Sequence, residues 1–111
     1  MDIKRKFEVL AEKPEGVAAD DETCDTYVLY DEDHTLCNAL RIVLMKNPRV
    51  KFCGYSIPHP LENKVFFRVE TFDKTPAIEI FKSGLEDLKE MCTIFQEKFQ
   101  DAIDESRSAA K

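Results

Sequence analysis

The stretch DEDHTLCNALRIVLMKNP, residues 31–48, carries the clearest helix signal in the first half of the chain. Either Asp33 or Thr35 can cap its N-terminus, and acidic residues before the first turn suit the positive end of a helix dipole. Apolar residues then recur at helical spacing, at Leu36, Leu40, Val43 and Leu44. Because Pro48 disfavours helical geometry in the residue before it, the helix is predicted to end near Asn47.

The same stretch raises three chemical alternatives. The first is a metal site, whose candidate ligands are His34, Cys37, Cys53 and His59. Only His34 and Cys37 have a spacing suited to one helical face, and no second ligand pair is recognisable. The second is acid–base catalysis by Asp33 with His34, which would need a pocket and a third positioned group. The third is a thiol switch at Cys37 or Cys53, and the helix dipole could lower the pKa of Cys37. In each case the sequence favours a helix start with thiols buried as small core residues.

Strand signals lie on both sides of this helix. Residues 26–30, TYVLY, are β-branched and aromatic, and residues 6–10, KFEVL, alternate as a short strand does. Residues 50–57, VKFCGYSI, and 64–72, KVFFRVETF, are joined by the six residues of PHPLEN, 58–63. Each proline of that turn fixes its own φ and favours an extended conformation in the residue before it, so the turn is stiff. Two strands joined by so short a turn predict an antiparallel hairpin.

The last third of the chain predicts one long helix. Thr75 can cap it, and Pro76 suits the first helical position, where a missing N–H costs nothing. Apolar residues then follow steps of three and four, at Ile78, Phe81, Leu85, Leu88, Cys92, Phe95, Phe99 and Ile103. This spacing is typical of a heptad-like stripe.

Such a helix is too long for the domain that it should cover. Residues 76–105 would run roughly 45 Å at about 1.5 Å per residue. A domain of this size has a diameter of roughly 35 Å, so the helix should overhang it while its stripe stays apolar. An exposed apolar stripe indicates a partner surface, and Gly84 would let another backbone come close. The alternative is a helix that kinks or frays early and covers only its own sheet.

Composition limits the class of protein further. With 111 residues and 43% hydrophobic content, the chain fits one domain with a real core. Its 22 acidic and 16 basic residues give a net charge of −6, which is unfavourable for nucleic-acid binding. No apolar run approaches the roughly 20 residues of a membrane span, and the N-terminus lacks a secretory pattern. The four cysteines form no CxxC pair, so we expect free thiols in a soluble intracellular protein.

The domain organisation follows from these patterns. Residues 1–25 are predicted to be a flexible N-terminal segment with a short strand, because 11–23 are polar and acidic with Pro and Gly. Residues 26–105 are predicted to form the folded domain. The remainder, 106–111, is predicted to be a disordered tail.

Long motifs in the chain resemble a known family. DEDHTLCNALRIVLMKNPRVKFCGYSIPHPLEN, KVFFRVET and PAIEIFKSGLEDL together resemble the small alpha-like subunits of eukaryotic and archaeal RNA polymerases, over roughly residues 26–103. NALR, MKNP, FCGY and PAIEIFKSGL resemble the subunit shared by RNA polymerases I and III. PHPLE resembles the polymerase II counterpart. Two departures stand out: Cys37, where the family usually has Gly, and Leu61, where the I/III branch more often has a small polar residue.

The resemblance implies a two-layer α+β fold, with a small antiparallel sheet of three to four strands covered by two helices, the C-terminal one long, as in the dimerisation domain of the bacterial alpha subunit. It implies a heterodimer with a larger alpha-like subunit, forming a platform for the two large catalytic subunits. Its contact helices would run from Leu36 to Lys46 and from Pro76 to about Glu105. It implies no catalytic residue, cofactor, metal, sequence-specific nucleic acid or membrane, and a location in the nucleus, including the nucleolus.

The candidate partner-binding residues are the apolar positions of these two helices. They are Leu36, Leu40, Val43, Leu44, Phe81, Leu85, Leu88, Cys92, Phe95, Phe99 and Ile103. An apolar repeat does not choose its partner, so a homodimeric adaptor that uses the same stripe remains the alternative.

Overall fold

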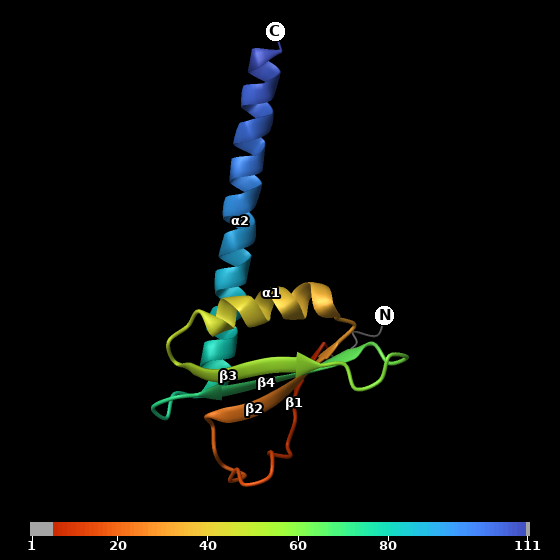
Figure 1. Cartoon of the computed structure of the whole chain (residues 1–111), viewed down its shortest axis with the longest axis vertical. Helices are drawn as coiled ribbons and strands as arrows, with labels where there is room; N and C mark the ends of the chain where they lie inside the picture. Colours follow the sequence, from red (N-terminus) through yellow and green to blue (C-terminus); the bar gives the residue numbers. More distant parts are fainter. Residues whose placement is uncertain (1–5, 111) are drawn as a thin grey trace.

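A four-stranded antiparallel sheet carries two helices on one face. The computed structural model describes residues 6–110. Its elements, in chain order, are β1 (Phe7–Val9), β2 (Cys24–Tyr30), α1 (His34–Met45), β3 (Val50–Ser56), β4 (Lys64–Thr71) and α2 (Ala77–Ala109). The strands lie in the order β1-β2-β4-β3. Figure 1 shows α2 rising away from the sheet, while α1 lies over the sheet alongside β3. This confirms the predicted two-layer α+β fold.

The alternation within β4 explains the two layers. Successive side chains of a strand point to opposite faces, and Val65, Phe67 and Val69 are all buried beneath the helices. Residues between them, such as Phe66 and Arg68, remain partly exposed on the other face. β4 pairs with β2 on one side and with β3 on the other, so the predicted hairpin through PHPLEN is confirmed.

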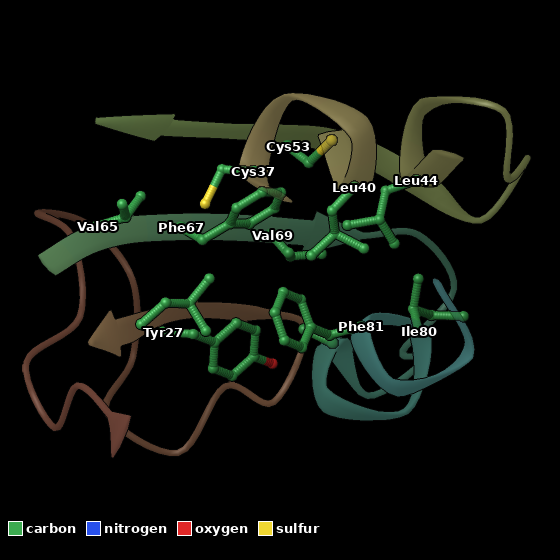
Figure 2. Close-up of a cluster of buried hydrophobic side chains, with 12 residues drawn as sticks. Tyr27, Cys37, Leu40, Leu44, Cys53, Val65, Phe67, Val69, Ile80 and Phe81 are labelled. Carbon is green, nitrogen blue, oxygen red and sulfur yellow. The ribbon is translucent and has the colours of Figure 1, made fainter. Parts of the chain in front are cut away.

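One cluster of apolar side chains joins the sheet to both helices (Figure 2). The Phe81 ring of α2 lies at its centre, with its centroid 4.5 Å from that of Tyr27 and 5.5 Å from that of Phe67. α1 contributes three fully buried side chains, Cys37, Leu40 and Leu44. The core therefore needs both helices, and part of the apolar surface of each helix is buried within this chain.

The start of α1 uses one of its two predicted caps. The Asp33 carboxylate accepts a hydrogen bond of 2.9 Å from the backbone N–H of Thr35. This bond lowers the pKa of Asp33, because it favours the charged carboxylate. Asp33 thereby satisfies one of the N–H groups that a helix start leaves without a partner.

The start of α2 differs from the prediction. Thr75 does not cap the helix; Pro76 occupies the cap position in an extended conformation, and no side chain bonds to the first turn. Instead the Ala77 N–H donates to the Glu22 carbonyl at 2.8 Å, because the segment before β2 passes beside the helix end. The Thr75 carbonyl accepts from the hydroxyl of Thr71.

The end of α2 also differs. The helix continues to Ala109, past the predicted end near Glu105. Residues 106–109 contain neither Gly nor Pro, and Ala and Arg are among the best helix formers, so nothing local stops the helix. At about 1.5 Å per residue its 33 residues span roughly 50 Å. Within residues 6–110 no helix is both long and apolar enough to cross a bilayer.

The overhang predicted for α2 is confirmed. The radius of gyration is 17.8 Å and the molecule measures 65 × 38 × 25 Å, whereas a compact chain of this length would have a radius near ~13 Å. Figure 1 shows the second half of α2 standing clear of the sheet. The helix is unbroken, so the alternative of an early kink or fray is not observed in the described chain.

The segment between β1 and β2 contains turns and is held by one lysine. The Lys13 ammonium donates to the carbonyls of Asp21 (2.9 Å) and Cys24 (2.7 Å), and it forms an ion pair with the Asp25 carboxylate. β1 pairs with β2, so residues 7–9 belong to the sheet. The flexibility predicted for the N-terminal segment stays a prediction, and residues 1–5 and 111 lie outside the described chain.

Gly84 marks the point where α1 crosses α2. A Cβ at this position would lie 2.6 Å from Leu44 Cδ2 and 3.1 Å from Leu44 Cγ. The close approach is therefore made by the chain's own α1. This corrects the expectation that Gly84 serves a partner's backbone, and the reason is that the crossing falls over the sheet rather than on the overhang.

Gly84→Ala is expected to destabilise the fold. Replacing Gly by Ala in a helix gains up to about 1 kcal/mol from backbone propensity, but forcing a methyl group into a packed crossing costs about 1–3 kcal/mol. We expect a net loss of about 1–2 kcal/mol, measured as the free energy of unfolding in urea. An increase in stability would show that α1 can shift away without cost.

Candidate protein-interaction surface

The apolar face of α2 runs unbroken from the sheet into the overhang. At about 100° per residue, the distal apolar residues fall within a sector of about 80° on the helix surface. We call this set the α2 stripe: Leu85, Leu88, Cys92, Phe95, Phe99 and Ile103. The buried residues Ala77, Phe81 and Gly84 lie on the same side of the helix, so one continuous face is covered at its start and open further along.

The open part of this face carries large aromatic rings in solvent. Phe95 is 73% exposed and Phe99 is 59% exposed, whereas Leu88 is partly buried against the core. Met91 widens the apolar surface beside Phe95. Full burial of each ring is worth roughly 2–3 kcal/mol, so this surface has a large free energy to gain from contact.

Three predicted partner-binding residues belong instead to the chain's own core. Leu40, Leu44 and Phe81 are all at most 1% exposed. The helical period places them correctly on the apolar faces, but α1 and the first turns of α2 lie directly over the sheet and bury them there. They are corrected to core residues. Of the residues predicted on α1, Leu36 and Val43 stay partly exposed.

Two grooves flank the crossing of α1 and α2. The first, of about 400 Å³, lies between β1, the start of α1 and α2, and Phe7, Leu36, Ile78 and Leu85 line it. The second, of about 440 Å³, lies between the end of α1 and α2, and Ile42, Val43, Pro48 and Met91 line it. The α2 stripe, the two grooves and the exposed residues of α1 therefore form one surface on the helical side of the molecule.

The residues considered as metal ligands or catalysts at the start of α1 make other contacts in the structure. His34 Nδ1 lies 2.8 Å from the hydroxyl of Tyr55, so its ring takes part in a hydrogen bond to β3. Among the residues that the structure describes, no three His, Cys, Asp or Glu side chains gather as metal ligands would. Asp33 is occupied as the helix cap.

Cys37 is a core residue with a buried thiol. Its side chain is fully buried, and burial, followed by the charges of Glu32 and Asp33, raises its pKa to about 11. The expectation that the helix dipole lowers this pKa was wrong, because desolvation and two nearby carboxylates favour the neutral thiol. Cys53 is also buried, and burial raises the pKa of its thiol as well.

The sequence reasoning missed the first groove. Ile78 belonged to the predicted stripe but not to the predicted contact residues, and Phe7 was assigned only to a strand. The signal was present in the alternation of residues 6–10, which puts Phe7 on the same face of the sheet as Tyr27. What joins them to α2 is the pairing of β1 with β2, which lies far from α2 in sequence.

The fold and this surface are typical of a domain that pairs with another protein: a small core supports two helices that leave apolar side chains exposed. Comparison with known proteins agrees with this class. Residues 24–98 match the model of the RNA polymerase Rpb3/Rpb11 dimerisation domain, and the chain belongs to this family.

Several curated relatives share long segments with the chain. It is 47% identical over 85 residues to the DNA-directed RNA polymerases I and III subunit RPAC2 of Saccharomyces cerevisiae, which covers 77% of this chain and 60% of that protein. It is 49% identical over 83 residues to the Schizosaccharomyces pombe subunit of the same name, covering 75% and 66%. It is 42% identical over 100 residues to the DNA-directed RNA polymerases I and III subunit rpc19 of Dictyostelium discoideum, covering 90% and 79%.

The matches cover only part of the two yeast relatives. The matched part of the chain spans 60% and 66% of the lengths of the two yeast relatives. Among solved structures, DNA-directed RNA polymerase subunit L from Thermoplasma acidophilum superposes with a TM-score of 0.71 and covers 92% of both chains. At 19% sequence identity that likeness concerns the fold alone.

Proposed function

We propose that the chain is an assembly subunit of DNA-directed RNA polymerases I and III. It pairs with the larger alpha-like subunit, and the pair forms the platform on which the two large catalytic subunits assemble. Its own role is structural, and its place is the nucleus, including the nucleolus. The family match over residues 24–98 and the names of the curated relatives support this proposal.

The observation that carries the proposal is the exposed α2 stripe. Phe95 and Phe99 lie in the part of α2 that stands clear of the sheet, where nothing in the described chain covers them. A partner that covers the stripe and the grooves excludes water from these rings. Permanent complexes of this kind bury more than about 2,000 Å² and resemble a domain core cut in half.

The proposed contact residues are the predicted ones that stay accessible. They are Leu36, Val43, Leu85, Leu88, Cys92, Phe95, Phe99 and Ile103. Phe95 and Phe99 are the strongest candidates for hot spots, because large aromatic rings gain most from complete desolvation.

The names of the relatives favour polymerases I and III over polymerase II. The motif PHPLE, which resembles the polymerase II counterpart, lies in the turn between β3 and β4. Its Leu61 is 87% exposed there, so packing places little constraint on this residue. A departure at such a position carries less weight than motifs that contain buried core residues, such as Leu40 in NALR and Phe81 in PAIEIFKSGL.

The function is tested by purification through an affinity tag on this chain, in the organism from which it comes. We expect the larger alpha-like subunit and the large subunits of polymerases I and III in the eluate. Recovery of polymerase II large subunits instead would move the chain to the other branch. Recovery of no polymerase subunit would contradict the proposal.

A further inference from the structure

Charge is distributed very unevenly around α2. The side of the helix opposite the α2 stripe carries six exposed acidic residues and no basic one: Glu79, Glu86, Glu90, Glu97, Asp101 and Asp104. One flank of the stripe carries the reverse. At about 100° per residue, Lys82, Lys89 and Arg107 fall within about 20° of one another on that flank. We call these three residues the basic flank.

The basic flank contains no acidic residue of its own. Gln96 and Gln100 occupy the remaining distal positions of the same sector of α2. Lys82, Lys89 and Arg107 are exposed, and none of them forms an ion pair within residues 6–110. The acidic and basic residues of α2 occupy separate sectors of the helix. The three cations therefore lie between the acidic side and the α2 stripe.

The basic flank is continuous with the first groove. Lys82 lines that groove together with Leu36 and Leu85, and with Lys6, which forms an ion pair with Glu32 of the same groove. An apolar element that lies in the groove and along the α2 stripe therefore passes Lys82 first and then Lys89. Residues that flank an apolar stripe meet the flanks of the partner helix, where ion pairs select partner and orientation.

We propose that the element covering the α2 stripe is an amphipathic helix of a different protein, with carboxylates along the flank that faces Lys82, Lys89 and Arg107. This inference rests on the proposed pairing with the alpha-like subunit and specifies the chemistry of that partner. The carboxylates offset the desolvation of the three cations, and they set the register of the two helices.

A second copy of this chain in an antiparallel arrangement fits the basic flank poorly. In an antiparallel pair related by a two-fold axis, each flank meets its own copy, so lysine would face lysine. In a parallel pair the basic flank would meet the other flank, where Lys98 lies between Asp87 and Glu105. Like charges held opposite each other disfavour the wrong partner. In the parallel pair Asp87 and Glu105 of the second copy would face the basic flank, so the homodimer that charge disfavours is the antiparallel one.

The test uses purified heterodimers of the chain with the larger alpha-like subunit of the same organism. Their Kd is measured by dissociation on dilution, in about 50 mM and about 500 mM salt. Lys82→Glu/Lys89→Glu is the variant, and Arg49→Glu/Lys51→Glu, which changes the net charge equally on β3 and the turn before it, is the matched control.

We expect Lys82→Glu/Lys89→Glu to weaken binding about 30-fold in low salt and less than about 3-fold in high salt, because salt screens exposed charges. The control variant should keep the wild-type Kd at both salt concentrations. If the double variant forms no heterodimer in low salt but recovers in high salt, the proposal is supported. Lys89→Gln, with an expected loss of about 3-fold in low salt, gives a second readout.

An unchanged Kd for both lysine variants, with Phe95→Asp still abolishing the complex, would overturn the charge inference and leave the proposed function standing. A stable homodimer of the wild-type chain that the alpha-like subunit does not displace would overturn both. The two failures are therefore distinguishable from each other.

Discussion

Phe95→Asp is expected to abolish pairing with the larger alpha-like subunit while leaving the sheet and both helices folded. The Phe95 ring is 73% exposed, so its replacement removes little packing within the chain. In the complex the new carboxylate would be buried without a partner, at a cost of several kcal/mol. We expect at least about a 100-fold loss of affinity, measured as the yield of co-purified partner, with an unchanged circular dichroism spectrum.

Thr93→Asp is the matched control for this substitution. Thr93 lies two residues earlier on the exposed side of α2, where its hydroxyl bonds back to the Lys89 carbonyl. The Thr93→Asp substitution introduces the same carboxylate into the same helix outside the α2 stripe. We expect the partner to co-purify with this variant at wild-type yield. Wild-type yield for Phe95→Asp as well would show that the interface lies elsewhere.

Phe81→Ala is expected to act through the fold rather than through the interface. The ring is 1% exposed and contacts Tyr27 and Phe67 at the centre of the core. Removing a buried Phe side chain costs about 3–5 kcal/mol, which is a large part of the roughly 5–15 kcal/mol that stabilises a typical domain. We expect this loss in the free energy of unfolding measured in urea.

Phe99→Ala separates the two effects. It deletes the same ring from the exposed part of the same face, so the stability of the chain should stay within about 0.5 kcal/mol of wild type while pairing weakens. If Phe81→Ala kept wild-type stability and lost only pairing, Phe81 would be an interface residue, as its spacing alone suggests. The pair of variants thus locates the boundary between core and interface along one helix.

That boundary is what the sequence could not supply. The steps of three and four that place Phe81 on an apolar face place Phe95 on the same face, and periodicity does not say what covers either ring. The answer depends on where α2 leaves the sheet, which is set by the pairing of β1, β2, β4 and β3. Helix length against domain size predicted that an overhang exists, but not which residue begins it.

Local signals were reliable where the competing contacts are also local. Asp33 caps α1 as its position predicted, and Pro48 follows the helix end. Thr75 failed as a cap because a distant carbonyl, that of Glu22, takes the first N–H of α2. The contacts of Lys13 with Asp21, Cys24 and Asp25 were not anticipated, since no periodic pattern encodes a side chain that reaches back onto its own loop.

Cys37 illustrates the same limit for chemistry. Its place in the first turn of α1 suggested a lowered thiol pKa, and only the packing of α1 over the sheet shows that burial dominates. Its side chain also fits inside the core, so this departure from the family pattern is accommodated within the chain.

The central claim is that the α2 stripe is an obligate surface for a different protein. The most direct measurement is the molar mass by light scattering after size exclusion, for the chain alone and for the chain co-expressed with the larger alpha-like subunit. We predict a soluble 1:1 complex, and self-association of the chain on its own that increases with its concentration. A monodisperse monomer or homodimer that ignores the alpha-like subunit would contradict the claim.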